Sequence, residues 1–311
     1  MREKFKKYVA ADALAVILVV IMVFAAEVTG EREIIFPEMA ALSVGYLVSV
    51  KRGWMVNDRR MLALITVCAV LGVLIVRYIN VGDYLEVLIA FAMSQMIFLY
   101  SGTTLAPFIS AIVLPVVLQT TTWVYPVSAF ILTGILILGH RLLLKLGIRE
   151  EEKFIPVSLS SAADKKDAAL RVLTLVLIGA AAYASGNKFV IAPPLLVAFT
   201  ELSRPGNKAK EKPFKTIALL TLCALEGAIL RYALVMKAGL ALSLAAAIIM
   251  AAALLIMHVF DMYMPPAGAV AILSILIPAE AVVTFPLQVA IGISIFTLSA
   301  KTMFGRKETG R

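Results

Sequence analysis

One acidic residue stands in the middle of an apolar run that is long enough to cross a bilayer. Glu226 lies near the centre of residues 214–236, next to Gly227. An unpaired charge at that depth costs roughly 2.5–3.5 kcal/mol on insertion scales, so such a residue usually faces a cavity or a partner. We therefore expect Glu226 either to bind and release a proton or to form a structural hydrogen bond with a neighbouring helix.

Two further stretches place small residues, hydroxyl groups and prolines where apolar segments begin. They are Ser101, Gly102, Thr103 and Thr104 in the first half of the chain, and Pro265, Pro266, Ala267 and Gly268 in the second. Proline suits the first turn of a helix, and small residues let a ligand approach the free backbone N–H groups. Because a helix N-terminus carries roughly half a positive charge, the two stretches are predicted to form an anion site. Ordinary tight turns are the alternative.

Two arginines occupy similar places, about a turn from the outer ends of their predicted helices. Arg77 precedes Tyr78, and Arg231 precedes Tyr232. These arginines could attract an anion. They could instead extend to the lipid headgroups, with the tyrosines in the aromatic belt.

His258 and Asp261 lie three residues apart on one predicted helix face, just before the second proline stretch. They could relay a proton or simply be solvated at the membrane interface. Two residues do not make a metal site, and we predict neither a metal nor another cofactor.

Other acidic residues near predicted helix ends are expected to meet solvent or headgroups, namely Glu38, Glu201 and Glu280. No nucleophile elbow, P-loop or HExxH motif is present, so the sequence does not predict an enzyme.

The elements that must position these residues are membrane helices. The 311-residue chain is 61% hydrophobic and 16% charged, whereas soluble domains are about 25% charged. Its continuous apolar runs predict an all-α polytopic protein in the lipid bilayer. The net charge of +9 comes from short basic clusters between these runs, at 2–7, 51–60, 141–171, 204–215 and 301–311. This is the positive-inside pattern of a membrane protein, not a basic face for nucleic acid.

The apolar runs and their polar breaks predict about twelve crossing segments. The first six are roughly 9–28, 34–50, 60–80, 84–101, 104–120 and 124–146, and the second six roughly 169–187, 190–203, 214–236, 239–259, 265–282 and 285–303. Placing the basic clusters inside puts both termini in the cytoplasm of a cell-membrane protein. The segments at 34–50 and 190–203 are short and carry proline near their starts, so they need not span. The first segment also resembles a secretory signal, but we expect it to remain as a helix.

The two halves of the chain resemble one another. The motif TxCAxxG occurs at 66–72 and at 221–227, and an Arg-Tyr pair follows each copy. Leu114-Pro115 matches Ile277-Pro278, and Tyr125-Pro126 matches Phe285-Pro286. We predict two tandem repeats of six segments, at 1–146 and 169–311, joined by a cytoplasmic linker at 147–168. Repeats with an even number of crossings are parallel, as in some transporters.

The second half resembles a known family of membrane proteins. The stretch YMPPAGAVAI at 263–272, entering a helix, is similar to the signature of the HPP family, which usually reads His-Pro-Pro followed by Ala-Gly-Ala. The stretch APPLLVAFTELSRP at 192–205 resembles the first helix of that family. The resemblance implies an all-helical membrane fold and, for some members, nitrite transport. Met264 replaces the histidine of the family signature, so a role tied to that histidine does not carry over.

These observations favour a transporter or channel for a small solute, such as nitrite or another small inorganic anion, passive or driven by an ion gradient. An exporter or flippase of an amphipathic organic molecule or lipid is one alternative. An intramembrane enzyme that modifies a lipid is a weaker one. The sequence leaves the substrate, the coupling ion, the direction and the oligomeric state open, a homo-oligomer included.

Overall fold

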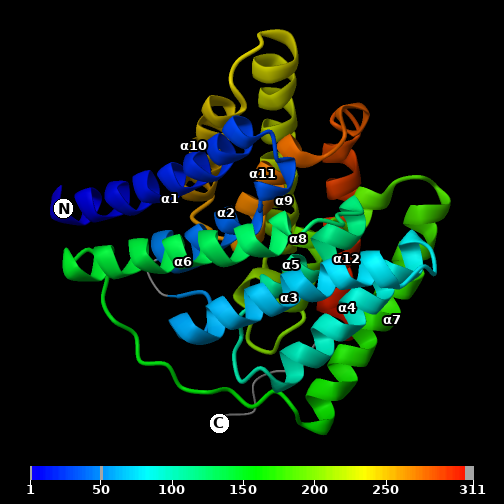
Figure 1. Ribbon diagram of the computed structural model, residues 1–311. Coiled ribbons are helices and arrows are strands. Elements are labelled where there is room, and N and C mark those ends of the chain that lie inside the picture. The colour runs from blue at the N-terminus through cyan, green and yellow to red at the C-terminus, as the bar shows by residue number, and fades with distance from the viewer. Residues whose placement is uncertain (1, 50–51, 305–311) are drawn as a thin grey trace.

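A computed structural model of the chain describes residues 2–49 and 52–304 (Figure 1). This part of the chain is helical and contains no strand, which confirms the all-α prediction. Parts of two predicted basic clusters, at 51 and at 305–311, lie outside the described residues.

Eight of the described helices are long and apolar enough to cross a membrane. An 18-residue helix extends about 27 Å, close to the ~30 Å thickness of the hydrocarbon core. These helices are α1 (Arg2–Thr29), α3 (Asp58–Tyr78), α4 (Asp83–Tyr100), α6 (Val124–Lys145), α7 (Ala162–Ala184), α9 (Pro213–Leu230, continued by the π-helical Arg231–Lys237), α10 (Leu242–Val259) and α12 (Phe285–Met303). The chain is therefore a multi-pass membrane protein.

Four shorter helices each lie between two long ones along the chain. They are α2 (Glu38–Ser43, continued by the π-helical Val44–Val48), α5 (Phe108–Leu118), α8 (Pro193–Leu202) and α11 (Pro265–Leu276). Eleven helical residues extend only about 16 Å, roughly half of a bilayer core. The prediction that 34–50 and 190–203 are short is confirmed, whereas 104–120 and 265–282 contain shorter helices than predicted. The second of these ends early because Pro278 disfavours a helical conformation at Ile277.

The short helices form the centre of the molecule. Residues 38–48, 108–117, 193–200 and 265–275 are buried at every position, whereas only 39–44% of the most apolar 18-residue window in each long helix is buried. A helix that is apolar on all sides belongs inside a bundle, and a helix with one apolar and buried face belongs at its edge. The long helices thus surround the short ones and present their exposed apolar side chains to lipid.

Hydrogen bonds gather some of the connections at one end of the bundle. The Nη1 atom of Arg60 donates to the Ser101 carbonyl (2.6 Å), and the Val157 amide donates to the Gly102 carbonyl (3.0 Å). This end includes the basic stretch at 52–60 and the 146–161 linker, which runs from α6 to α7 in Figure 1. We call it the basic end.

The other connections meet at the opposite end. Lys188 Nζ donates to the Val117 carbonyl (3.0 Å), and the Phe189 amide donates to Gln288 Oε1 (3.0 Å). The Glu27 carboxylate accepts hydrogen bonds from backbone amides that begin α10. Consecutive helices therefore run between two ends, even where the helix itself is short.

The two halves of the chain interlock. Each half has the order long, short, long, long, short, long helix. Helix α1 packs against α10 of the other half, and α4 packs against α7 (Figure 1). Among the short helices, α2 packs on α11 and α5 packs on α8.

The glycines of the two TxCAxxG motifs lie at equivalent close contacts. A Cβ atom at Gly72 would be 2.4 Å from the Ile112 carbonyl oxygen of α5, and one at Gly227 would be 2.6 Å from the Ala271 carbonyl oxygen of α11. Both glycines thus permit close approach of helix backbones. The proposed match of Pro115 with Pro278 is wrong, because Pro115 lies inside α5 and Pro278 follows the end of α11.

Helix α7 begins at Ala162, earlier than the predicted start near 169. Ser161 accepts a hydrogen bond from the Asp164 amide, and the Asp164 carboxylate accepts one from the Ser161 amide. This capping box satisfies two backbone N–H groups that the helix itself leaves without a partner. It thereby fixes the start of α7 in a polar stretch. The non-helical linker is correspondingly short, at 146–161.

Candidate functional site

The first predicted anion stretch does not start a helix. Residues 101–103 form bends, Thr104 is also non-helical, and α5 begins only at Phe108, after Pro107. Thr103 Oγ1 donates to the Met55 carbonyl (2.6 Å), and Thr104 Oγ1 accepts from the Met55 amide (2.9 Å). The prediction of a helix N-terminus here is wrong, because Pro107 sets the start of the helix and the hydroxyl groups hold a neighbouring loop.

The loop that these threonines hold spans residues 52–57 and contacts central helices at the basic end. Its Trp54 is buried, and the indole Nε1 donates to Glu201 Oε1 of α8 (2.7 Å). Gly53 donates to the Gly45 carbonyl of α2 (3.3 Å). The 52–57 loop thus closes the basic end of the centre.

The second predicted stretch does start a helix, at Pro265. This start is packed against α2: a Cβ atom at Gly268 would be 3.4 Å from the Ala40 carbonyl oxygen, and a Cβ atom at Gly45 would be 3.1 Å from Pro265 Cγ. Pro265, Pro266, Ala267 and Gly268 are all buried. The 52–57 loop lies beside both predicted stretches: Met55 bonds to Thr103 and Thr104, and a Cβ atom at Gly53 would be 4.0 Å from Pro265 Cγ.

The two equivalent arginines have different roles. Arg231 is buried, and its Nη1 atom donates to the carbonyls of Ser274 (2.5 Å) and Ile277 (2.7 Å), which caps the C-terminal end of α11. Arg77 is exposed, with its guanidinium 5.5 Å from the centre of the Trp123 ring. The contacts of Arg231 lie inside the protein, so this arginine does not extend to the lipid headgroups, whereas the exposed Arg77 is free to do so.

His258 pairs with an acidic residue other than Asp261. Its Nε2 atom lies 3.3 Å from Asp12 Oδ2 of α1, and its Nδ1 atom lies 2.6 Å from the Leu254 carbonyl. Asp261 follows the end of α10, where its backbone has a positive φ of 42°. Of the two alternatives, the relay between His258 and Asp261 is not formed, because α1 supplies the carboxylate that pairs with His258. Asp261 is exposed after the end of α10, as the alternative of a solvated residue expects.

The acidic residues also differ from expectation. Neither carboxylate oxygen of Glu226 has a hydrogen-bond partner among the described residues, although both are buried. Glu38, expected near solvent, is 1% exposed: Ser110 Oγ donates to one of its oxygens and the other has no partner in the described structure. Glu201 is partly buried and bonded to Trp54, whereas Glu280 is exposed as expected.

The sequence reading missed a polar cluster at the basic end. Tyr46 donates to Asp58 Oδ1 (2.6 Å), Arg141 forms an ion pair with Asp58 (3.0 Å), and the buried His140 lies against the Tyr46 ring, with 4.3 Å between ring centres. Arg52 completes the cluster, which borders a cleft of about 880 Å³. The cluster joins residues about a hundred positions apart, so no local motif predicts it. The one sequence signal is His140, a polar residue inside the predicted membrane segment 124–146.

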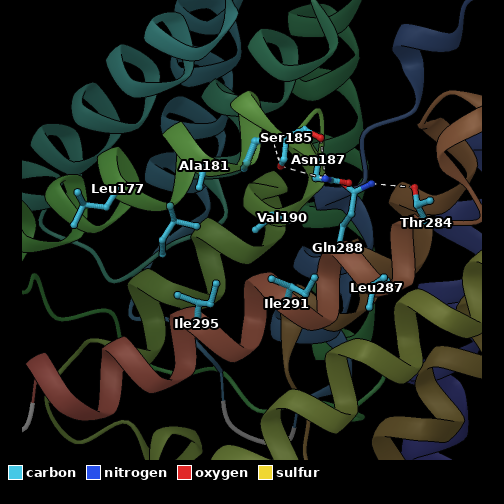
Figure 2. Close-up of a pocket in the computed structure, with 12 residues that line it drawn as sticks. Leu177, Ala181, Ser185, Asn187, Val190, Thr284, Leu287, Gln288, Ile291 and Ile295 are labelled. Carbon is cyan, nitrogen blue, oxygen red and sulfur yellow. Dashed lines mark hydrogen bonds between the residues drawn. The ribbon is translucent and has the colours of Figure 1, made fainter.

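A second cavity opens sideways between two membrane helices. Figure 2 shows this groove, of about 530 Å³, with Leu177 of α7 and Ile291 and Ile295 of α12 along its apolar walls. Its polar end lies near the connection to α8, where Asn187 donates to Ser185 and Gln288 Nε2 donates to Thr284 Oγ1 (3.0 Å). We call it the lateral groove.

Within the described part of the chain, no three His, Cys, Asp or Glu residues gather in a group that could hold a metal ion. The chain was also compared with family models, with curated proteins and with solved structures. No family model, curated protein or solved structure matches it.

Proposed function

We propose that this protein is an integral membrane transporter or channel for a small solute, with a small inorganic anion such as nitrite as its cargo. The observation that carries the proposal is the buried centre of four half-length helices. Interrupted helices are tolerated at membrane depth where they are buried in protein or line a cavity. In transporters such helices build the substrate site between two repeats.

The proposal includes the topology of the chain. All twelve segments then cross in turn, the four short helices together with the non-helical residues beside them, both termini lie in the cytoplasm, and the two halves are tandem parallel repeats. The shared order of elements, the reciprocal packing of α1 on α10 and α4 on α7, and the equivalent contacts of Gly72 and Gly227 support it. The resemblance of the second half to the HPP family supports the same class of protein.

Glu38 is the best candidate for ion coupling. A fully buried carboxylate with one hydrogen bond is costly unless it gains a proton, a cation or another donor. Glu38 begins a central short helix and has one oxygen without a partner among the described residues. Binding and release of a proton there would be linked to rearrangement of α2 against α5, which supplies Ser110.

The test is anion uptake into proteoliposomes that contain the purified chain. We expect nitrite uptake in the wild type and a decrease of about tenfold or more in Glu38→Gln, equivalent to about 1.4 kcal/mol. Glu280→Gln, at an exposed position, is the matched control and should retain the wild-type rate. Absence of flux for every small anion tested, or equal rates in the two variants, would contradict the proposal. The nitrite uptake rate of Glu226→Gln in the same assay shows whether the second buried carboxyl group contributes as Glu38 does.

The lateral groove favours a second candidate, an exporter or flippase of an amphipathic molecule. Its walls are apolar, and hydroxyl and amide groups lie at one end, which matches a molecule with an apolar body and a polar head. In this case Ala181→Trp, which fills the groove, should slow the movement of a fluorescent lipid across proteoliposome membranes. Unchanged lipid movement in this variant would remove the candidate.

A further inference from the structure

The cleft at the basic end is large compared with a small inorganic ion. Its volume of about 880 Å³ lies in the range of about 300–1,000 Å³ that is typical of pockets for drug-sized molecules. The walls come from the 52–57 loop, the start of α3, the end of α6 and the linker. Leu144 and Phe154 give this lining an apolar part.

Arg52 supplies a positive charge at this cleft without an acidic partner of its own. Its guanidinium lies 4.6 Å from the centre of the Tyr46 ring, and Nη2 is 3.5 Å from His140 Nε2. A guanidinium can only donate hydrogen bonds, so this ring nitrogen of His140 acts as the acceptor. Arg52 takes part in neither the Arg141–Asp58 nor the His258–Asp12 ion pair. Its Nη1 donates to the Val56 carbonyl (3.4 Å), and its buried Nε has no partner among the described residues.

The acidic residues of the cleft are occupied or exposed. Asp58 accepts from Tyr46 and Arg141, and Glu152 accepts from the Arg52 backbone amide (3.1 Å). Glu151 lies exposed at the lining. The lining also holds Arg59, Arg141 and Lys153, so with Arg52 its four cations exceed its three carboxylates by one charge. This balance favours a ligand with one negative group, which would supply an acidic partner for Arg52.

We propose that this cleft is a binding site for an organic monoanion, a carboxylate attached to an apolar or aromatic body. The carboxylate binds Arg52 through a charge-assisted hydrogen bond from its guanidinium. The body of the ligand lies against Leu144 and Phe154. The proposal concerns binding at the cytoplasmic side and does not require that this ligand be transported.

The test uses radiolabelled benzoate and the detergent-purified full chain in equilibrium dialysis. We expect saturable binding at millimolar concentrations and an increase in Kd of about tenfold or more in Arg52→Gln, the effect of losing one charge-assisted hydrogen bond. Arg52→Lys should lie between the two. Arg77→Gln, which removes an exposed arginine at the opposite end, is the matched control and should leave the Kd unchanged. The unfolding midpoint of each variant without benzoate checks that it is folded.

Competition by unlabelled anions tests the class of ligand. Acetate and nitrite should displace benzoate less well than unlabelled benzoate does, because they cannot contact the apolar wall. Absence of saturable benzoate binding, or an equal Kd in folded Arg52→Gln, would overturn the site. Equal displacement by nitrite would overturn the organic class, and stronger displacement by ATP would overturn the restriction to one charge. Nitrite flux in proteoliposomes is measured separately. Failure of the benzoate site therefore leaves the proposed transport function untouched, and absence of nitrite flux leaves the benzoate site untouched.

Discussion

At the scale of single residues, identical residue types have different roles in the two halves. Arg77 and Arg231 both precede tyrosine, but Arg231 caps α11 through two carbonyls whereas Arg77 lies exposed beside Trp123. The difference follows from the end of α11, which presents free carbonyls to Arg231. A helix end leaves such groups without partners, and a buried arginine satisfies them.

The paired glycines lead to a prediction at this scale. Gly72→Ala and Gly227→Ala should each destabilise the folded protein by about 1–3 kcal/mol, because the new methyl group overlaps a backbone carbonyl oxygen of the facing helix. Gly134→Ala in α6 is the matched control, since nothing lies within 4 Å of a Cβ atom there. It should be neutral or stabilising, because alanine has the higher helix propensity. Thermal unfolding in detergent measures all three, and similar midpoints would show that the close contacts are not tight.

At the scale of elements, the 52–57 loop ties together parts of both halves. It bonds to the bend before α5, to α2 and to Glu201 at the end of α8. An indole N–H and a carboxylate that pair inside a protein are difficult to separate, because each would remain buried without a partner. In a transporter this loop would have to move for the centre to open at the basic end.

Loss of the Trp54–Glu201 hydrogen bond should therefore loosen the loop. We expect Trp54→Phe to raise the hydrogen-exchange rate of backbone amides in 52–57 and in 101–105, which contact each other. Trp123→Phe is the matched control, because Trp123 is 46% exposed at the opposite end. Mass-spectrometric exchange measurements on both variants compare the segments. Unchanged protection in Trp54→Phe would show that the threonine contacts alone hold the loop.

At the scale of the whole molecule, the question is how many helices cross the membrane. If all twelve cross, the α3–α4 and α9–α10 connections lie outside and the α8–α9 connection lies inside. If only the eight long helices cross, these three positions are reversed. The two topologies place the linker inside and the α7–α8 connection outside alike, so these two positions serve as controls. The three connections that differ decide between the topologies.

Single cysteines at exposed positions test the twelve-crossing topology. An impermeant maleimide added to intact cells should label Asn80→Cys and Ala238→Cys but not Lys208→Cys, and all three side chains are exposed in the structure. Ser185→Cys should be labelled and Lys153→Cys should not under either topology, which makes them the controls. The native Cys68 and Cys223 are buried and should not react. The reverse pattern at the first three positions would support eight crossings.

The sequence by itself determined the class of fold. Composition required membrane helices, since apolar runs of this length have no place in a soluble core of this size. Proline near the starts of 34–50 and 190–203 also predicted that these segments contain short helices. Such features depend on local residue types, so they can be recognised without knowing which helices are neighbours.

Only the tertiary structure decided which polar groups meet. His258 pairs with Asp12 instead of the nearby Asp261, Trp54 with Glu201, and Arg52 with the missed His140. Each pair joins helices or loops that are far apart in sequence. Apolar side chains pack with many partners at similar energy, so the apolar pattern of a helix does not determine which helices become its neighbours. The same packing buries Glu38, which the sequence placed near solvent, at the meeting point of short helices from across the first half.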